Sequence, residues 1–136
     1  MRNNEYLTDE NYAYFPELEM DESESGVSLL IRHDFYSSDN EHGQKLLNSL
    51  LMQYLDSNKK ISNLFIVDSG VRLLDSENDY LVAVSDLLHI ADEVFVCKDS
   101  VDYYGTLIEE TPNMSMIDSN DFFALVINQK NLIQIN

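Results

Sequence analysis

The sequence predicts a three-layer α/β/α fold in which helices cover a mainly parallel sheet of about five strands, wound like flavodoxin. Short apolar runs without polar alternation recur along the chain, and such runs are typical of strands covered on both faces. Segments of 10–15 residues with helical spacing of apolar residues separate them, which is the pattern of right-handed β-α-β units. Only four glycines and two prolines occur among 136 residues, which argues against a low-complexity chain.

Each expected element follows from its own pattern. Apolar runs predict strands at 27–31, 64–67, 94–96 and 132–135, with a brief strand at 108–110. Helical spacing predicts a helix at 44–56 ended by residues 58–60, one at 80–91 capped by Asp79, and one over 116–126 capped by Asp118 or Ser119. Residues 71–74 either extend the second strand or begin a turn, and residues 101–105 form a short helix or a turn.

The composition divides the chain into two parts. Residues 1–25 hold eight acidic residues and one basic residue, Arg2, and show neither helical nor strand periodicity. We interpret them as a partly flexible acidic arm. Its interleaved aromatic residues pin it to the domain or to a neighbouring subunit, or else the arm is a mobile tail. Residues 26–136 form the single α/β domain expected at this length.

The formal net charge of −17 limits the classes of partner. Nucleic-acid binding needs clustered lysines and arginines, and an anionic membrane repels an acidic surface, so neither partner is expected. The acidic residues either keep the surface well solvated or form an acidic face that binds a basic partner. One cysteine cannot form an intramolecular disulfide, and neither a leader nor a run of about 20 apolar residues is present, so we expect a cytoplasmic protein.

Cys97 is the candidate catalytic residue because it directly follows the apolar run 94–96. In open α/β sheets, ligands bind just beyond the carboxyl ends of strands. Sulfur relay needs a partly exposed thiolate that attacks a persulfide and holds the transferred sulfur. A helix beginning after Cys97 would favour that anion, whereas Asp99 and Asp102 would oppose it. The alternative is a buried structural cysteine that packs as a small hydrophobic side chain.

Five further residues are expected to line a pocket beside Cys97, and they follow the predicted strands: His33, Ser69, Gly70, Lys98 and Ser100. His33 would bind an anion or tune the cysteine, or it is a polar loop residue. Gly70 would permit a positive φ or a close backbone approach. Tyr103 and Tyr104 line the same pocket or pack between subunits. The histidine and aspartate spacings match no metal-site motif, so neither a metal nor another cofactor is expected.

Four fragments, in order along the chain, resemble the DsrE/DsrF-like family, most closely the C-terminal domain of YedF-type selenium-metabolism-associated proteins. They are Gly43–Leu47, Asp68–Leu73, Cys97–Gly105 and Asn113–Met114. The resemblance covers about four-fifths of the chain. It implies an α/β fold, homo-oligomers such as dimers, trimers or hexamers, and persulfide relay in some members. Ser100 stands where the family has a second cysteine, so a dithiol cannot form here.

Two functions therefore remain open. The first is a single-cysteine sulfur carrier or sulfur-relay accessory protein, with Cys97 as the acceptor and with protein partners that supply and take the sulfur. The second is a non-catalytic oligomeric scaffold, or an acidic interaction protein that binds a basic partner. Whether the chain is an enzyme stays open between them.

Overall fold

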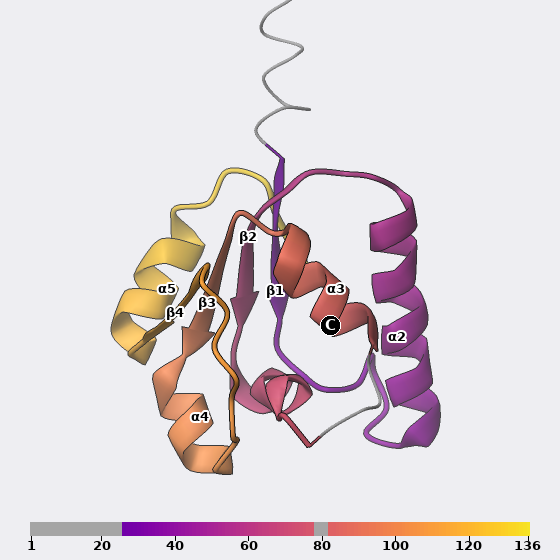
Figure 1. The fold of residues 1–136 in the computed structure, drawn as a ribbon, viewed down its shortest axis with the longest axis horizontal. Helices are drawn as coiled ribbons and strands as arrows, with labels where there is room; N and C mark the ends of the chain where they lie inside the picture. The colour runs from indigo at the N-terminus through magenta and orange to yellow at the C-terminus, as the bar shows by residue number, and fades with distance from the viewer. Residues whose placement is uncertain (1–25, 78–81) are drawn as a thin grey trace, which may run out of the picture.

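The computed structural model describes residues 26–77 and 82–136. One sheet of five parallel strands lies at its centre, in the order β4-β3-β2-β1-β5. The strands are β1 (Val27–Ile31), β2 (Ile61–Ile66), β3 (Glu93–Cys97), β4 (Met114–Ile117) and β5 (Leu132–Gln134). The connecting helices are α2 (Glu41–Asp56), the 3-10 helix η1 (Asp68–Leu74), α3 (Val82–Ile90), α4 (Lys98–Tyr104) and α5 (Ser119–Ile127) (Figure 1). The predicted three-layer α/β/α fold is confirmed.

The strand order contains a single reversal. The chain places β1 to β4 next to one another in sequence order, and α5 then leads back across the sheet to β5, which pairs with β1. This order differs from the 2-1-3-4-5 order of flavodoxin, although both sheets are doubly wound. All carboxyl ends of the strands face one edge, where η1 and α4 begin (Figure 1). Polar residues that follow neighbouring strands are therefore brought together at this edge.

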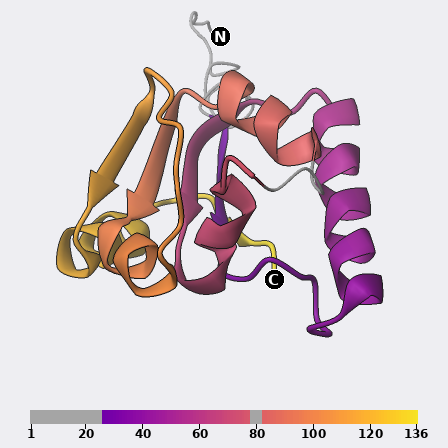
Figure 2. The same cartoon turned by 60° about the horizontal axis from the view of Figure 1, so that its bottom comes forward.

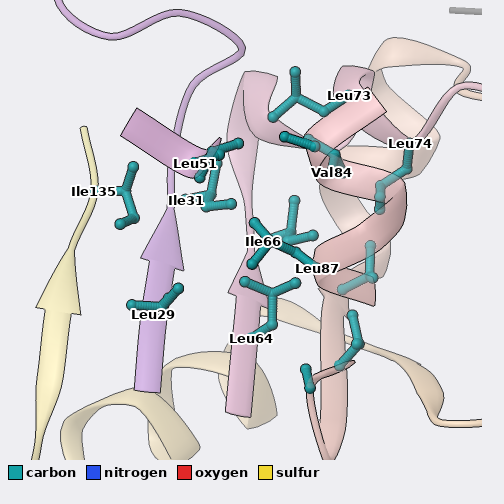
Figure 3. Packing of buried hydrophobic residues seen from close by; sticks show 14 of the residues in the cluster. Leu29, Ile31, Leu51, Leu64, Ile66, Leu73, Leu74, Val84, Leu87 and Ile135 are labelled. Carbon is teal, nitrogen blue, oxygen red and sulfur yellow. The ribbon is translucent and has the colours of Figure 1, made fainter. Parts of the chain in front are cut away.

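The larger core lies between the sheet and the helices α2 and α3 (Figures 2 and 3). Alternate residues of the strands point into it, and α2 and α3 contribute Leu47, Leu51, Val84 and Leu87. The smaller core lies on the opposite face, where the nine-residue helix α5 packs through Phe122 and Val126. Phe122 and Val126 are four residues apart and share the packed face of α5, and Phe123, Leu125 and Ile127 stay exposed. The first face is therefore covered more completely than the second.

The structure corrects two local expectations, at 114–117 and 108–110, and decides two that the sequence left open, at 71–74 and after Cys97. Residues 114–117 form β4 and not the start of a helix, and α5 begins after its N-cap Asp118. Residues 71–74 belong to η1. Residues 108–110 contribute only an isolated bridge between Asp75 and Ile108. The short helix α4 begins at Lys98, directly after Cys97. In each case strand pairing or a packed neighbour decides between patterns that short apolar runs leave open.

Two expectations lie outside the described residues: the arm at 1–25, and the start of the helix at Asp79 to Leu81. Across 26–77 and 82–136, none of the helices combines the length and the apolar character that crossing a membrane requires.

Candidate functional site at the carboxyl ends of β2 and β3

Cys97 ends β3 and is the N-cap residue of α4, as its position in the sequence predicts. Its side chain points to the α5 face of the sheet, where it packs with Phe65, Val67 and Phe122. Only 2% of the residue is exposed. The cysteine therefore stands at the expected edge, but it forms the floor of the site and not its surface.

A cavity of about 330 Å³ opens above this floor. This volume lies within the range of about 300–1,000 Å³ that is typical of ligand pockets. Its walls come from the ends of β2 and β3, from both ends of α4 and from the first half of α5. The residues that line it are Val67, Asp68, Cys97, Asp99, Ser100, Tyr103, Tyr104, Ser119 and Phe123. Carboxylates and aromatic rings thus line the cavity above the buried thiol.

Asp68 has an unusual backbone conformation at the turn from β2 into η1. Its φ of 55° is in the left-handed region, which is costly for residues other than glycine, although aspartate tolerates it better than most. Two residues of α4 hold it there. Its N–H donates to Ser100 Oγ at 2.9 Å, and Tyr104 Oη donates to its carboxylate at 3.1 Å. Strained residues of this kind cluster at binding and catalytic sites, so Asp68 marks this cavity as a functional candidate.

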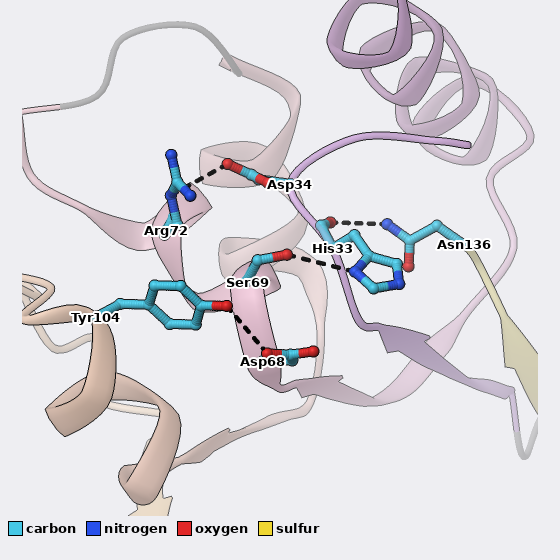
Figure 4. Close-up of polar contacts among 7 residues, drawn as sticks. All are labelled: His33, Asp34, Asp68, Ser69, Arg72, Tyr104 and Asn136. Carbon is cyan, nitrogen blue, oxygen red and sulfur yellow. Dashed lines mark hydrogen bonds and ion pairs between the residues drawn. The ribbon is translucent and has the colours of Figure 1, made fainter. Parts of the chain in front are cut away.

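Tyr104 connects the cavity to a second set of contacts (Figure 4). The Arg72 guanidinium lies 5.8 Å from the centre of its ring, and Arg72 Nε lies 3.3 Å from the carboxylate of the buried Asp34. Burial raises the pKa of Tyr104, and the hydrogen bond to Asp68 with the charge of that carboxylate adds to the effect. Tyr104 is therefore held neutral as a donor to Asp68.

Asp99 joins the amino ends of α4 and α5. Hydrogen bonds from Ser119, first from its side chain and then from its backbone N–H at 3.0 Å, lower the pKa of Asp99. The N-cap Asp118 also accepts from Asp121 N–H at 2.8 Å. Two carboxylates thus already occupy the amino end of α5, where an anionic ligand would otherwise be favoured.

The described residues that line the cavity carry negative charge and no positive charge. Its lining includes Asp68 and Asp99, and no lysine, arginine or histidine of the described ranges is part of it. Lys98 pairs with Asp102, one turn further along α4, where its Nζ lies 3.2 Å from the carboxylate, and its charge makes a smaller contribution than Ser119 to the lowered pKa of Asp99. An anion would therefore meet repulsion in this cavity, and a cation would be attracted.

Of the five predicted pocket residues, only Ser100 lines the cavity with Cys97. His33 and Ser69 are brought together with each other, since His33 Nδ1 lies 3.3 Å from Ser69 Oγ, at the ends of β1 and β2 (Figure 4). Gly70 has the predicted close backbone approach, because a Cβ there would lie 2.8 Å from Ile31 O. His33, Ser69 and Gly70 thus lie together where β1 and β2 end, and β2 separates β1 from β3. Lys98 is exposed on α4.

Sequence reasoning missed part of the lining. It left Tyr103 and Tyr104 open between pocket and subunit packing, and it treated Asp99 only as a charge near the thiol. Phe123 and Ser119 gave no signal, because they reach the cavity from a helix that begins more than 20 residues after Cys97. The positive φ at Asp68 was not predicted, because a glycine is the usual sequence signal for this conformation and none stands at this position.

In the described part of the chain, no group of three histidine, cysteine, aspartate or glutamate residues is arranged to hold a metal ion. No family model matches this sequence, and no curated protein matches it. The resemblance to DsrE/DsrF-like domains stays a prediction.

Proposed function

We propose that the chain is a non-catalytic interaction protein whose cavity at the ends of β2 and β3 binds a lysine or arginine side chain of a basic protein partner. The observation that carries this proposal is the lining. Two carboxylates, Asp68 and Asp99, and three aromatic residues, Tyr103, Tyr104 and Phe123, surround a cavity of about 330 Å³. Carboxylates pair with a cation, and aromatic faces attract it through their quadrupoles.

The expected strength of these contacts identifies the ligand as part of a larger molecule. A cation–π contact at an exposed site contributes about 0.5–1 kcal/mol, and an exposed ion pair about 0.2–1 kcal/mol. A single cationic side chain therefore binds weakly, in the millimolar range. Useful affinity requires a partner that makes further contacts around the cavity, and the charge of −17 favours its approach if it is basic.

The test is a titration of the isotope-labelled protein with three blocked tripeptides, Gly-Arg-Gly, Gly-Lys-Gly and Gly-Gln-Gly. We expect the arginine and lysine peptides to shift the amide signals of Asp99 and Ser100, and the glutamine peptide to leave them in place. Rising salt should weaken the shifts, since the attraction between exposed charges is screened.

Paired variants make this test specific. Asp68→Asn with Asp99→Asn removes both carboxylates of the cavity and should abolish the shifts. The control, Asp39→Asn with Asp56→Asn, removes the same charge from exposed positions near and on α2 and should preserve them. Equal losses in both variants would mean that net charge alone attracts the peptides, and the proposal would fail.

A second candidate, a single-cysteine sulfur carrier, is favoured by the position of Cys97 on the cavity floor. In this reaction the Cys97 thiolate attacks the outer sulfur of a donor persulfide. A new S–S bond forms at Cys97, the S–S bond of the donor breaks, and the donor leaves as a thiolate. The carboxylates of the lining oppose the anionic nucleophile, which is why this function ranks second.

Treatment of the native protein with sodium polysulfide, followed by intact mass measurement, separates the two candidates. The carrier function requires the addition of sulfur to the folded protein and its absence in Cys97→Ser. A thiol that reacts only after denaturation in urea would support the interaction function and contradict the carrier function.

The homo-oligomer expected from the family resemblance is tested separately, by sedimentation of the native chain and of Ile127→Glu, which alters a side chain that is 78% exposed.

A further inference from the structure

A second groove lies on the α2/α3 side of the sheet, between η1, α3 and the segment that leads to β4. Its volume is about 420 Å³, and it shares no residue with the cavity above Cys97. Leucine and valine side chains of η1 and α3 form its floor: Leu73, Leu74, Val84 and Leu88. Carboxylates form much of its rim: Asp75, Glu109 and Glu110. His89, Ser76, Ser85, Thr111 and Pro112 complete the lining.

The walls of this groove are fixed by hydrogen bonds. On one side, Ser76 N–H donates to Leu107 O at 2.9 Å, next to the bridge between Asp75 and Ile108. On the other, Asn113 Nδ2 donates to the carbonyls of Leu88 and Ala91, both at 2.9 Å. The segment with the two glutamates is therefore attached at both ends. A groove held in shape in this way loses little freedom when a ligand binds.

From the apolar floor and the acidic rim, we infer that this groove binds a basic peptide segment with one aliphatic side chain between lysines or arginines. The aliphatic side chain fills the floor, and the flanking cations face Asp75, Glu109 and Glu110. A second copy of this chain is a poor occupant, because each copy carries a net charge of −17. No lysine or arginine of 26–77 or 82–136 lines the groove to neutralise its rim.

The probe for this inference is a fluorescently labelled peptide, Lys-Lys-Leu-Lys-Lys, whose binding to the full chain is followed by anisotropy. The comparison peptide replaces leucine by serine and keeps the charge. We expect it to bind at least threefold more weakly, because the floor then has no apolar partner. Equal binding of the two peptides would reduce the interaction to general charge attraction and would overturn the inference.

Three variants locate the site. Ser85→Phe places a ring in the groove from an exposed position on α3 and should abolish the preference for leucine. Glu109→Gln with Glu110→Gln should weaken binding about threefold to tenfold, because it removes two of the three carboxylates that face the cations, both of them exposed. Asp39→Asn with Asp56→Asn, the matched control, should weaken it less.

A loss of binding in the control as large as that in the glutamate variant would contradict the inference, as would unchanged binding in Ser85→Phe. The outcome is independent of the function proposed above. Asp68→Asn with Asp99→Asn alters only the first cavity and should keep the leucine preference, so each site can fail without the other.

Discussion

Two neighbouring parts of the same sheet edge are used differently. The ends of β2 and β3 leave an open cavity above Cys97, whereas at the ends of β1 and β5 the side chain of Asn136 is hydrogen-bonded to the backbone of 32–35, which we call the closed part (Figure 4). There Asn136 Oδ1 accepts from Arg32 N–H at 2.8 Å, and its Nδ2 donates to His33 O at 2.7 Å and to Phe35 O at 2.9 Å.

The difference is instructive because the closed part is the one where a ligand is normally expected. In doubly wound sheets, ligands bind at the point where the strand order reverses, and here that point lies between β1 and β5. The side chain of Asn136 satisfies the backbone groups that a ligand would otherwise contact. A site is thus decided by which polar groups and which space remain free at the edge. The strand order alone does not decide it.

The largest effect is expected in the core beneath the floor of the open cavity, where Phe122 packs in the same cluster as Cys97. Phe122→Ala removes a fully buried ring that packs edge-on against Phe65, and such truncations cost about 3–5 kcal/mol. Phe123→Ala, one residue further along α5, truncates a ring that is 47% exposed and should cost less than about 1 kcal/mol. Urea denaturation measures both. Similar losses would mean that the cavity rim is as tightly packed as its floor.

The closed part is tested by Asn136→Ala, which removes three hydrogen bonds at once. Unsatisfied backbone groups cost about 1–3 kcal/mol, so we expect a loss of roughly that size and faster hydrogen exchange at the Arg32 amide. Asn128→Ala removes one exposed hydrogen bond to Ala124 O and serves as the control. Equal losses of stability in the two variants would show that the hydrogen bonds of Asn136 do not hold the ends of β1 and β5 together.

The sequence predicted the parts of this architecture that depend on local pattern. The apolar runs around Leu29, Leu64 and Val94 gave three neighbouring strands, and Cys97 was placed at the correct edge. The pocket itself depended on contacts between distant segments. His33 was expected beside Cys97, but β2 separates β1 from β3, so His33 meets Ser69 instead. Phe123 and Ser119 enter through the docking of α5, which no local pattern encodes.

A smaller effect tests the strained turn at Asp68. The difference in stability between alanine and glycine should have opposite signs at Asp68 and at Asp56. At Asp68, with its φ of 55°, alanine should be less stable than glycine by about 1–2 kcal/mol, because only glycine adopts this conformation without cost. At Asp56, the last residue of α2, glycine should be the less stable substitution, by up to about 1 kcal/mol. Thermal unfolding of the four variants measures this. Alanine equal to glycine at Asp68 would remove the argument from strain.

The stability of the protein at acidic pH depends on the ionisation of Asp99. Its folded-state pKa is lower than the ordinary 3.8 because of the hydrogen bonds from Ser119. The stabilising contribution of Asp99 is therefore present above pH 3.8 and is lost as the pH falls through the lowered value. We expect the difference in urea midpoint between the native chain and Asp99→Asn to shrink on acidification. A constant difference would show that the carboxylate charge has no role in joining α4 to α5.

The smallest effect concerns Tyr104, the residue shared by the open cavity and the contacts that lead toward the closed end. Its pKa is higher than the ordinary 10.0, first because of burial and then because of Asp68. The neutral phenol thus stabilises the fold fully below pH 10.0, and this contribution is lost as the pH rises through the raised value. Asp68→Asn removes the carboxylate and leaves the burial, so the Tyr104 phenol should titrate at lower pH, part of the way back toward the ordinary value. Because the chain has eight tyrosines, the measurement follows the carbon-13 signal of the labelled Tyr104 ring, assigned by its loss in Tyr104→Phe. An unchanged titration would mean that Asp68 and Tyr104 are not coupled, and that the strained turn is held by Ser100 alone.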